Sequence, residues 1–99
     1  MSKHRKAFET FASRIEDLES VEEITLFGSV ARGEHGVRSD VDVLVKTKSM
    51  DQRNQIEDAA LDVTSETGVP VTPVVIRNDA EKTDFLKTVE EEGKEYVRS

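Results

Sequence analysis

The sequence contains no cysteine and no tryptophan, and it has only four phenylalanines and one tyrosine. Without cysteine the chain cannot form a disulfide bond, a cysteine-ligated zinc site or a thiol nucleophile. It also lacks an apolar run of the length that crosses a membrane, about 18 residues or more. Residues 1–6 are charged and do not resemble a secretory signal. These absences predict a cytoplasmic protein with no membrane segment.

Basic residues are fewer than acidic ones: the chain has 14 Lys and Arg and 21 Asp and Glu, which gives a formal net charge of -7. A negative surface repels polyphosphate backbones, so we expect no direct binding to nucleic acid. The length of 99 residues fits a single domain over 1–99, and such a short chain buries a modest core. We therefore expect marginal stability or a stabilising partner.

Apolar spacing predicts an alternating order of elements. Phe8, Phe11 and Ile15 recur at the three- and four-residue intervals of one helical face. Pro73 has no backbone N–H to donate to a neighbouring strand, so the strand that contains it should lie at an edge of the sheet. The expected elements are a helix over 3–18, a strand over 24–27, a short helix within 28–33, strands over 41–45 and 69–76 separated by a helix over 49–67, and a last helix ended or weakened by Gly93. This order predicts an α/β (α+β) domain.

Helix boundaries are predicted from capping residues. Ser49 and Gln52 have the spacing of a capping box ahead of the helix over 49–67. Gly68 suits the residue that follows the end of that helix. Asn78 with Glu81 offers a second N-terminal cap, for the last helix.

Two carboxylates provide the first candidate site. Asp40 and Asp42 are two residues apart beside Val41, Val43 and Val45. Side chains alternate along a strand, so both carboxylates should point to one face while the valines point to the other. Paired carboxylates are typical ligands of Mg²⁺ or Mn²⁺, which then share substrate phosphates. The alternative is a strand end with two solvated carboxylates.

The second candidate site is the turn at residues 28–33. Gly28 allows close approach of the backbone to a phosphate, and the hydroxyl of Ser29 suits an anionic oxygen. Arg32 could add a charge-assisted contact, or it could pair with an acid of the surface. Gly28 and Gly33 also have the glycine spacing of a P-loop, but the Lys and Ser or Thr that would follow are absent, which excludes a P-loop. Taken alone, this turn is also compatible with an ordinary strand-to-helix connection.

Together the two parts resemble the nucleotidyltransferase superfamily of DNA polymerase β, and within it the minimal nucleotidyltransferases. The residues that carry the resemblance are Gly28, Ser29, Arg32, Gly33, Ser39, Asp40 and Asp42. The resemblance covers nearly the whole chain. It implies a short mixed sheet flanked by helices, ATP or another nucleoside triphosphate at Gly28 and Ser29, and Mg²⁺ held by Asp40 and Asp42, which are then also the catalytic residues.

The resemblance also implies a partner. Such proteins typically accompany a helical HEPN-domain protein, often as the antitoxin of a toxin–antitoxin pair, and several transfer AMP from ATP to a tyrosine of the HEPN ribonuclease. One position departs from the family: its third carboxylate is expected on the next strand, where this chain has Thr72. A hydroxyl is a poor metal ligand and a poor proton acceptor beside a carboxylate. The nearest acids in sequence, Asp62 and Asp79, are not assigned that role.

Three functions remain open from the sequence. The first is a nucleotidyltransferase that modifies a protein partner. The second, favoured by Thr72, is a catalytically degenerate module that blocks a HEPN ribonuclease by contact. The third is transfer to a small molecule, which a chain without an acceptor-binding domain disfavours. Among other residues, His4 and His35 are interpreted as surface histidines, Tyr96 as a packing residue, and Phe85 as a residue of the core or of a partner surface.

Overall fold

The computed structural model describes residues 2–33 and 39–96, with the backbone alone for residues 94–96. In chain order the elements are α1 (Lys3–Ile15), β1 (Val21–Phe27), α2 (Gly28–Ala31), β2 (Val41–Thr47), α3 (Arg53–Thr67), β3 (Val71–Arg77), α4 (Asp84–Glu92) and β4 (Lys94–Tyr96). No helix in these two ranges is long and apolar enough to cross a membrane.

The strands form one mixed sheet in the order β3-β2-β1-β4. The strands β2 and β3 are parallel and are connected through α3, while β1 is antiparallel to both of its neighbours. The α/β prediction and the edge position of the strand with Pro73 are therefore confirmed. The short strand β4 was not predicted, because three residues carry no periodicity and depend on pairing with β1.

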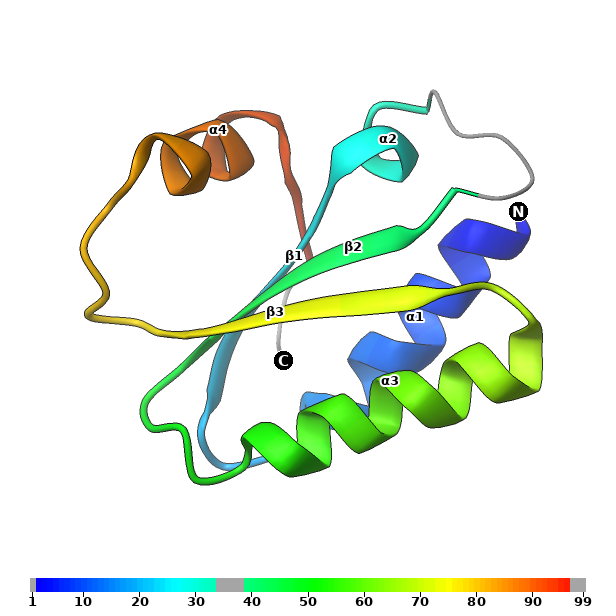
Figure 1. The fold of residues 1–99 in the computed structure, drawn as a ribbon, viewed down its shortest axis with the longest axis horizontal. Helices are drawn as coiled ribbons and strands as arrows, with labels where there is room; N and C mark the ends of the chain where they lie inside the picture. Colours follow the sequence, from blue (N-terminus) through cyan, green and yellow to red (C-terminus); the bar gives the residue numbers. More distant parts are fainter. Residues whose placement is uncertain (1, 34–38, 97–99) are drawn as a thin grey trace.

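One face of the sheet carries most of the apolar core. Helices α1 and α3 lie together on this side (Figure 1). Val41, Val43 and Val45 point into it and are fully buried, as the alternation along the strand predicts. Phe11 and Ile15 of α1 are also fully buried there. We call this side the core face.

The opposite side, which we call the site face, is covered by α4 (Figure 1). A small second cluster there joins Leu44 of β2 to Leu86 and Val89 of α4. Beside it, the Lys46 ammonium lies 2.9 Å from a carboxylate oxygen of Glu90. Both sides of β2 are thus covered at its centre, which explains its nearly continuous apolar sequence.

The predicted capping box of α3 is wrong. The helix begins at Arg53, and its N-cap Gln52 makes no capping hydrogen bond with its side chain. The Gln52 side-chain oxygen instead accepts a hydrogen bond of 2.8 Å from the backbone N–H of Ser20. Ser49 lies farther upstream, where its hydroxyl accepts a long bond from the N–H of Asp51. The Gln52 side chain, which the local pattern assigned to the cap, therefore makes a tertiary contact instead.

The cap predicted for α4 is also wrong, since Thr83 caps this helix through the N–H of Leu86. Asn78 lies next to the end of β3, and its amide binds the carboxylate of Glu22 instead. Gly93 does end the helix, as predicted.

Two further predictions near helix ends have opposite outcomes. Gly68 adopts a left-handed conformation with φ of 74° and ends α3, as predicted. The surface position expected for His4 is wrong, because its side chain is buried. His4 precedes Ala7 and Phe8 by three and four residues on α1, so it shares their buried stripe.

Candidate functional site

The site is built where β1 ends and α2 begins. Phe27 closes β1 and is the register partner of Asp42 on β2. Gly28 follows with φ of +76°, a conformation that glycine adopts without strain. A Cβ atom at Gly28 would lie 2.5 Å from the Oδ2 atom of Asp42. The predicted glycine turn and the predicted carboxylate are therefore in direct contact.

The two carboxylates interact through their charges. Asp42 is half-buried, whereas Asp40 is exposed and immediately precedes β2. Burial raises the pKa of Asp42 above its ordinary value, and the negative charge of Asp40 raises it further. The positive charge of Arg32 acts in the opposite direction. The site thus holds negative charge that the protein itself does not fully neutralise.

This charge distribution fits a divalent cation bound together with a substrate. The residues that the structure describes contain no group of three or more His, Cys, Asp or Glu side chains able to hold a metal. The carboxylate pair by itself suits Mg²⁺, which commonly takes one or two carboxylates and completes its shell with water and substrate phosphates. Asp40 and Asp42 are therefore the described residues that could hold such an ion, with the rest of its ligands supplied by water and substrate.

Thr72 occupies the position predicted for it, opposite Asp42 on the neighbouring parallel strand. Partners in a parallel pair point to the same face, so Thr72 lies on the site face beside Asp42. Neither of the nearby acids replaces it. Asp62 belongs to α3, on the other side of the sheet, and Asp79 lies beyond the far end of β3, where it pairs with Arg77 at 3.0 Å.

The remaining predicted residues follow the turn. Ser29 lies in the four-residue helix α2, and Arg32 is the C-cap of that helix. The Arg32 guanidinium lies 3.5 Å from a carboxylate oxygen of Glu92. Gly33 has φ of +74°, and a Cβ atom there would meet nothing within 4 Å. Ser39 is partly buried and directly precedes Asp40. The structure thus brings the turn and the carboxylates together, while His35 lies outside the described residues.

Two residues next to the site were not identified from the sequence, and both belong to α4. Glu92 is the partner of Arg32. Phe85 packs edge-on against Phe27, with ring centroids 5.5 Å apart and an interplanar angle of 82°. No local pattern could reveal these contacts, because more than 50 residues separate the partners in sequence.

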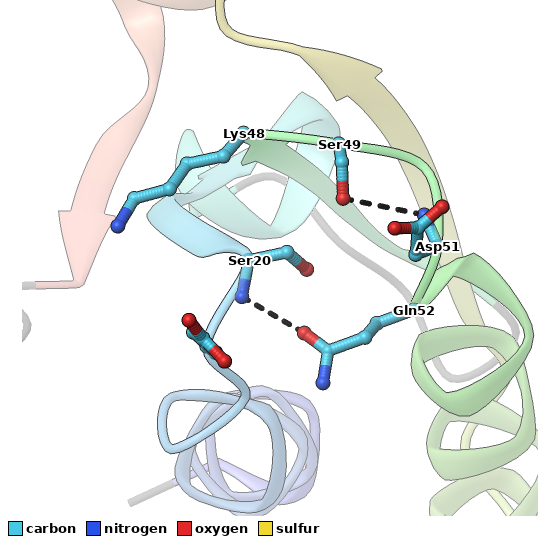
Figure 2. Close-up of a pocket in the computed structure, with 6 residues that line it drawn as sticks. Ser20, Lys48, Ser49, Asp51 and Gln52 are labelled. Carbon is cyan, nitrogen blue, oxygen red and sulfur yellow. Dashed lines mark hydrogen bonds between the residues drawn. The ribbon is translucent and has the colours of Figure 1, made fainter.

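A hollow of about 370 Å³ lies elsewhere, near the start of α3 (Figure 2). Ser20 and Gln52 face each other across it, with Ser49 and Asp51 on the adjoining loop. Ser20 precedes β1, whereas Gly28 follows it, so the hollow is at the opposite end of the sheet from Asp42. None of the predicted site residues lines it.

The chain is similar to known nucleotidyltransferases in sequence and in fold. Residues 5–96 match the family model described as a nucleotidyltransferase domain. A protein of Methanocaldococcus jannaschii with the working name of a protein adenylyltransferase is 31% identical over 80 residues, which cover 78% of this chain and 80% of that protein.

Solved structures share the fold. A minimal nucleotidyltransferase superposes with a TM-score of 0.70 at 24% identity and covers 95% of each chain. A toxin–antitoxin structure with AMP-PNP gives a TM-score of 0.67 at 18% identity, covering 96% of this chain and 72% of that one. With the family model matching nearly the entire length, and the Gly28 turn lying against Asp42, the chain belongs to the nucleotidyltransferase domain family.

Proposed function

We propose that this chain, acting as a single domain over residues 1–99, transfers AMP from ATP to a hydroxyl group of a protein partner. The observation that carries the proposal is the close approach of Gly28 to Asp42, which puts the turn proposed to receive the phosphates beside a carboxylate proposed to hold the metal. The working name of the archaeal relative, a protein adenylyltransferase, supports a protein acceptor. The toxin–antitoxin structure with AMP-PNP supports an adenine nucleotide as donor.

In this proposal each predicted residue has a role. Asp40 and Asp42 would hold Mg²⁺ or Mn²⁺, and the bound ion would supply positive charge that neutralises the phosphates of the substrate. Gly28 and Ser29 receive the triphosphate, and Arg32 contributes positive charge beside it. Gly33 allows the backbone to turn after α2, and Ser39 leads the chain into Asp40. These roles use the charge and turn geometry described above.

The reaction is an in-line displacement. The acceptor oxygen forms a bond to the α-phosphorus, the bond from that phosphorus to the bridging oxygen breaks, and pyrophosphate leaves. The acceptor proton has to pass to a base. Thr72 stands where a carboxylate would serve, so we assign that base to the partner or to solvent.

We propose a HEPN-domain protein as the partner, with this chain as the antitoxin of the pair. The fold shared with toxin–antitoxin structures supports this partner class. A second function is favoured by Thr72: a degenerate module that neutralises the HEPN ribonuclease by contact, without transfer. In that case the complex forms and inhibits the ribonuclease although no AMP is transferred.

Intact-mass measurements separate the two functions. The chain is mixed with its candidate HEPN-domain partner, ATP and Mg²⁺. Transfer requires that the partner gain one or more AMP units, and that Asp42→Asn lose this gain. Asp62→Asn is the matched control, because Asp62 is an exposed acid on the opposite side of the sheet. A stable complex with no mass gain, and ribonuclease inhibition that survives Asp42→Asn, would instead establish the binding module.

A further inference from the structure

The inference starts from an exposed aromatic ring on the site face. Among the residues whose side chains are described, the exposed large hydrophobic residues are Leu61 and Phe85, at 67% and 49% exposure. Leu61 belongs to α3 on the core side of the sheet, whereas Phe85 belongs to α4 over the site face. The next residue, Leu86, is buried, so the helix that carries Phe85 is anchored to the sheet.

The position of the Phe85 ring is fixed by Phe27. The two rings form an edge-to-face pair with centroids 5.5 Å apart, a geometry that aromatic side chains favour. Phe27 directly precedes Gly28 and is the register partner of Asp42. The aromatic pair therefore lies next to both parts of the proposed site, the turn and the carboxylates.

A second contact shows that α4 follows the turn along its length. Phe85, Val89 and Glu92 are four and three residues apart and so share one stripe of the helix. Phe85 contacts Phe27 just before the turn, and Glu92 pairs with Arg32 at its end. The stripe of α4 that carries Phe85 thus borders the turn from residue 27 to residue 32.

We infer that the Phe27–Phe85 pair is the surface on which the base of the bound nucleotide packs. The inference rests on the proposed function, because it needs the triphosphate at Gly28 and Ser29. A base has a flat face that packs favourably on an aromatic side chain within reach of the phosphate site. Phe85 is the large apolar side chain that the described part of the site face leaves exposed. Because stacking uses the face of a base and none of its hydrogen-bonding edge, we expect ATP and GTP to bind alike.

Comparing two ligands tests the inference in the intact chain. ATP and inorganic tripolyphosphate, each with Mg²⁺, are titrated against wild type and Phe85→Ala by calorimetry. We expect Phe85→Ala to weaken ATP binding about tenfold, which is within the range for one stacked base. Tripolyphosphate, which has no base, should bind both proteins equally. Leu61→Ala is the matched control and should change neither affinity.

A second variant gives a direct readout. The chain has no tryptophan, so Phe85→Trp introduces a single fluorophore at the proposed surface. Its emission should change when ATP binds and stay constant when tripolyphosphate binds. This measurement does not depend on how well Phe85→Ala folds.

The other outcomes are distinct. Unchanged ATP affinity in Phe85→Ala, together with a silent Phe85→Trp, overturns the inference while leaving the nucleotide site in place. Unchanged ATP affinity with a raised KM for the protein acceptor also overturns it, and assigns the pair to the acceptor. If wild type binds tripolyphosphate and ATP equally well, the base makes no contact. If wild type binds neither, the proposed function itself fails.

Discussion

The two faces of the sheet have opposite compositions. The core face is apolar and closed, with Phe11, Ile15 and the inward valines of β2 fully buried under α1 and α3. The site face combines a cluster of three buried residues with half-buried charges, an ion pair between Lys46 and Glu90, and the exposed ring of Phe85. One strand, β2, supplies residues to both faces.

This difference separates stability from function. Burial of apolar area is the dominant favourable term in folding, and most of it lies on the core face. A half-buried carboxylate such as Asp42 adds no favourable burial of apolar area, and the partial loss of its hydration makes folding less favourable. The core face can therefore support a site face that is poorly stabilised in itself. Substitutions on the two faces should affect different measurements.

The largest effect is expected from a phenylalanine on the core face. Phe11→Ala should cost about 3–5 kcal/mol of unfolding free energy, because Phe11 is fully buried and its removal leaves a cavity. Phe85→Ala, the same substitution on the site face, should cost about 0.5–1.5 kcal/mol for the lost ring contact. Urea unfolding measures both. Equal costs would contradict the assignment of stability to the core face.

The next effect compares two glycines of nearly equal conformation. Gly28 and Gly68 have φ of 76° and 74°, so replacement by Ala should cost each about 1–2 kcal/mol of stability. Only at Gly28 does the new Cβ displace a functional group, the carboxylate of Asp42. That carboxylate can rotate away, so the folding costs should be similar. Affinity for Mg²⁺ with triphosphate should fall about tenfold or more in Gly28→Ala alone.

Loss of triphosphate affinity in both glycine variants would show that backbone strain acts at a distance, and that the contact with Asp42 is not the cause. Circular dichroism of each variant confirms that the measured protein is folded.

A smaller change is expected from restoring a carboxylate on β3. Thr72→Asp places an acid opposite Asp42 on the site face. With Mg²⁺ present, AMP transfer should rise about tenfold, equivalent to about 1.4 kcal/mol of barrier, because the acid adds a metal ligand and a possible base. Thr72→Asn, similar in size and uncharged, is the control. An unchanged rate, with wild type already active, would mean that the partner or solvent provides this group, or that position 72 is not where the family's third carboxylate lies.

The smallest effect concerns the charge of Asp42 in the absence of metal. Its pKa is raised in the folded chain, mainly by burial. The folded state then holds the proton more tightly than the unfolded state, so stability falls as pH rises from the ordinary carboxyl range through the raised pKa. Asp42→Asn should therefore melt slightly higher than wild type at pH 7.

The difference between Asp42→Asn and wild type should shrink at acid pH, where the carboxyl is protonated in both states. Thermal melts across this pH range, with metal removed by chelation, measure the difference in melting temperature between the two proteins. A difference in melting temperature that grows toward acid pH would contradict the upward shift of the Asp42 pKa.

Much of the site was predictable because its information is local. Alternation placed Val41, Val43 and Val45 on one face, and Gly28 was identified from its place between a strand and a helix. The N-terminal caps of α3 and α4 were not predictable, whereas the glycines that end these helices were. The oxygen of Gln52 binds Ser20, and the amide of Asn78 binds Glu22, each more than 30 residues away in sequence. Side chains suited to a local cap were used for long-range contacts instead.

The sequence by itself determined the residues of the turn, the carboxylate pair and the order of the long elements, because periodicity and glycine chemistry act over a few neighbouring residues. The tertiary structure alone decided that β4 closes the sheet next to β1, and that α4 brings Phe85 and Glu92 to the turn. Those contacts join residues far apart in the chain, and they form only when the apolar residues of both faces are buried together.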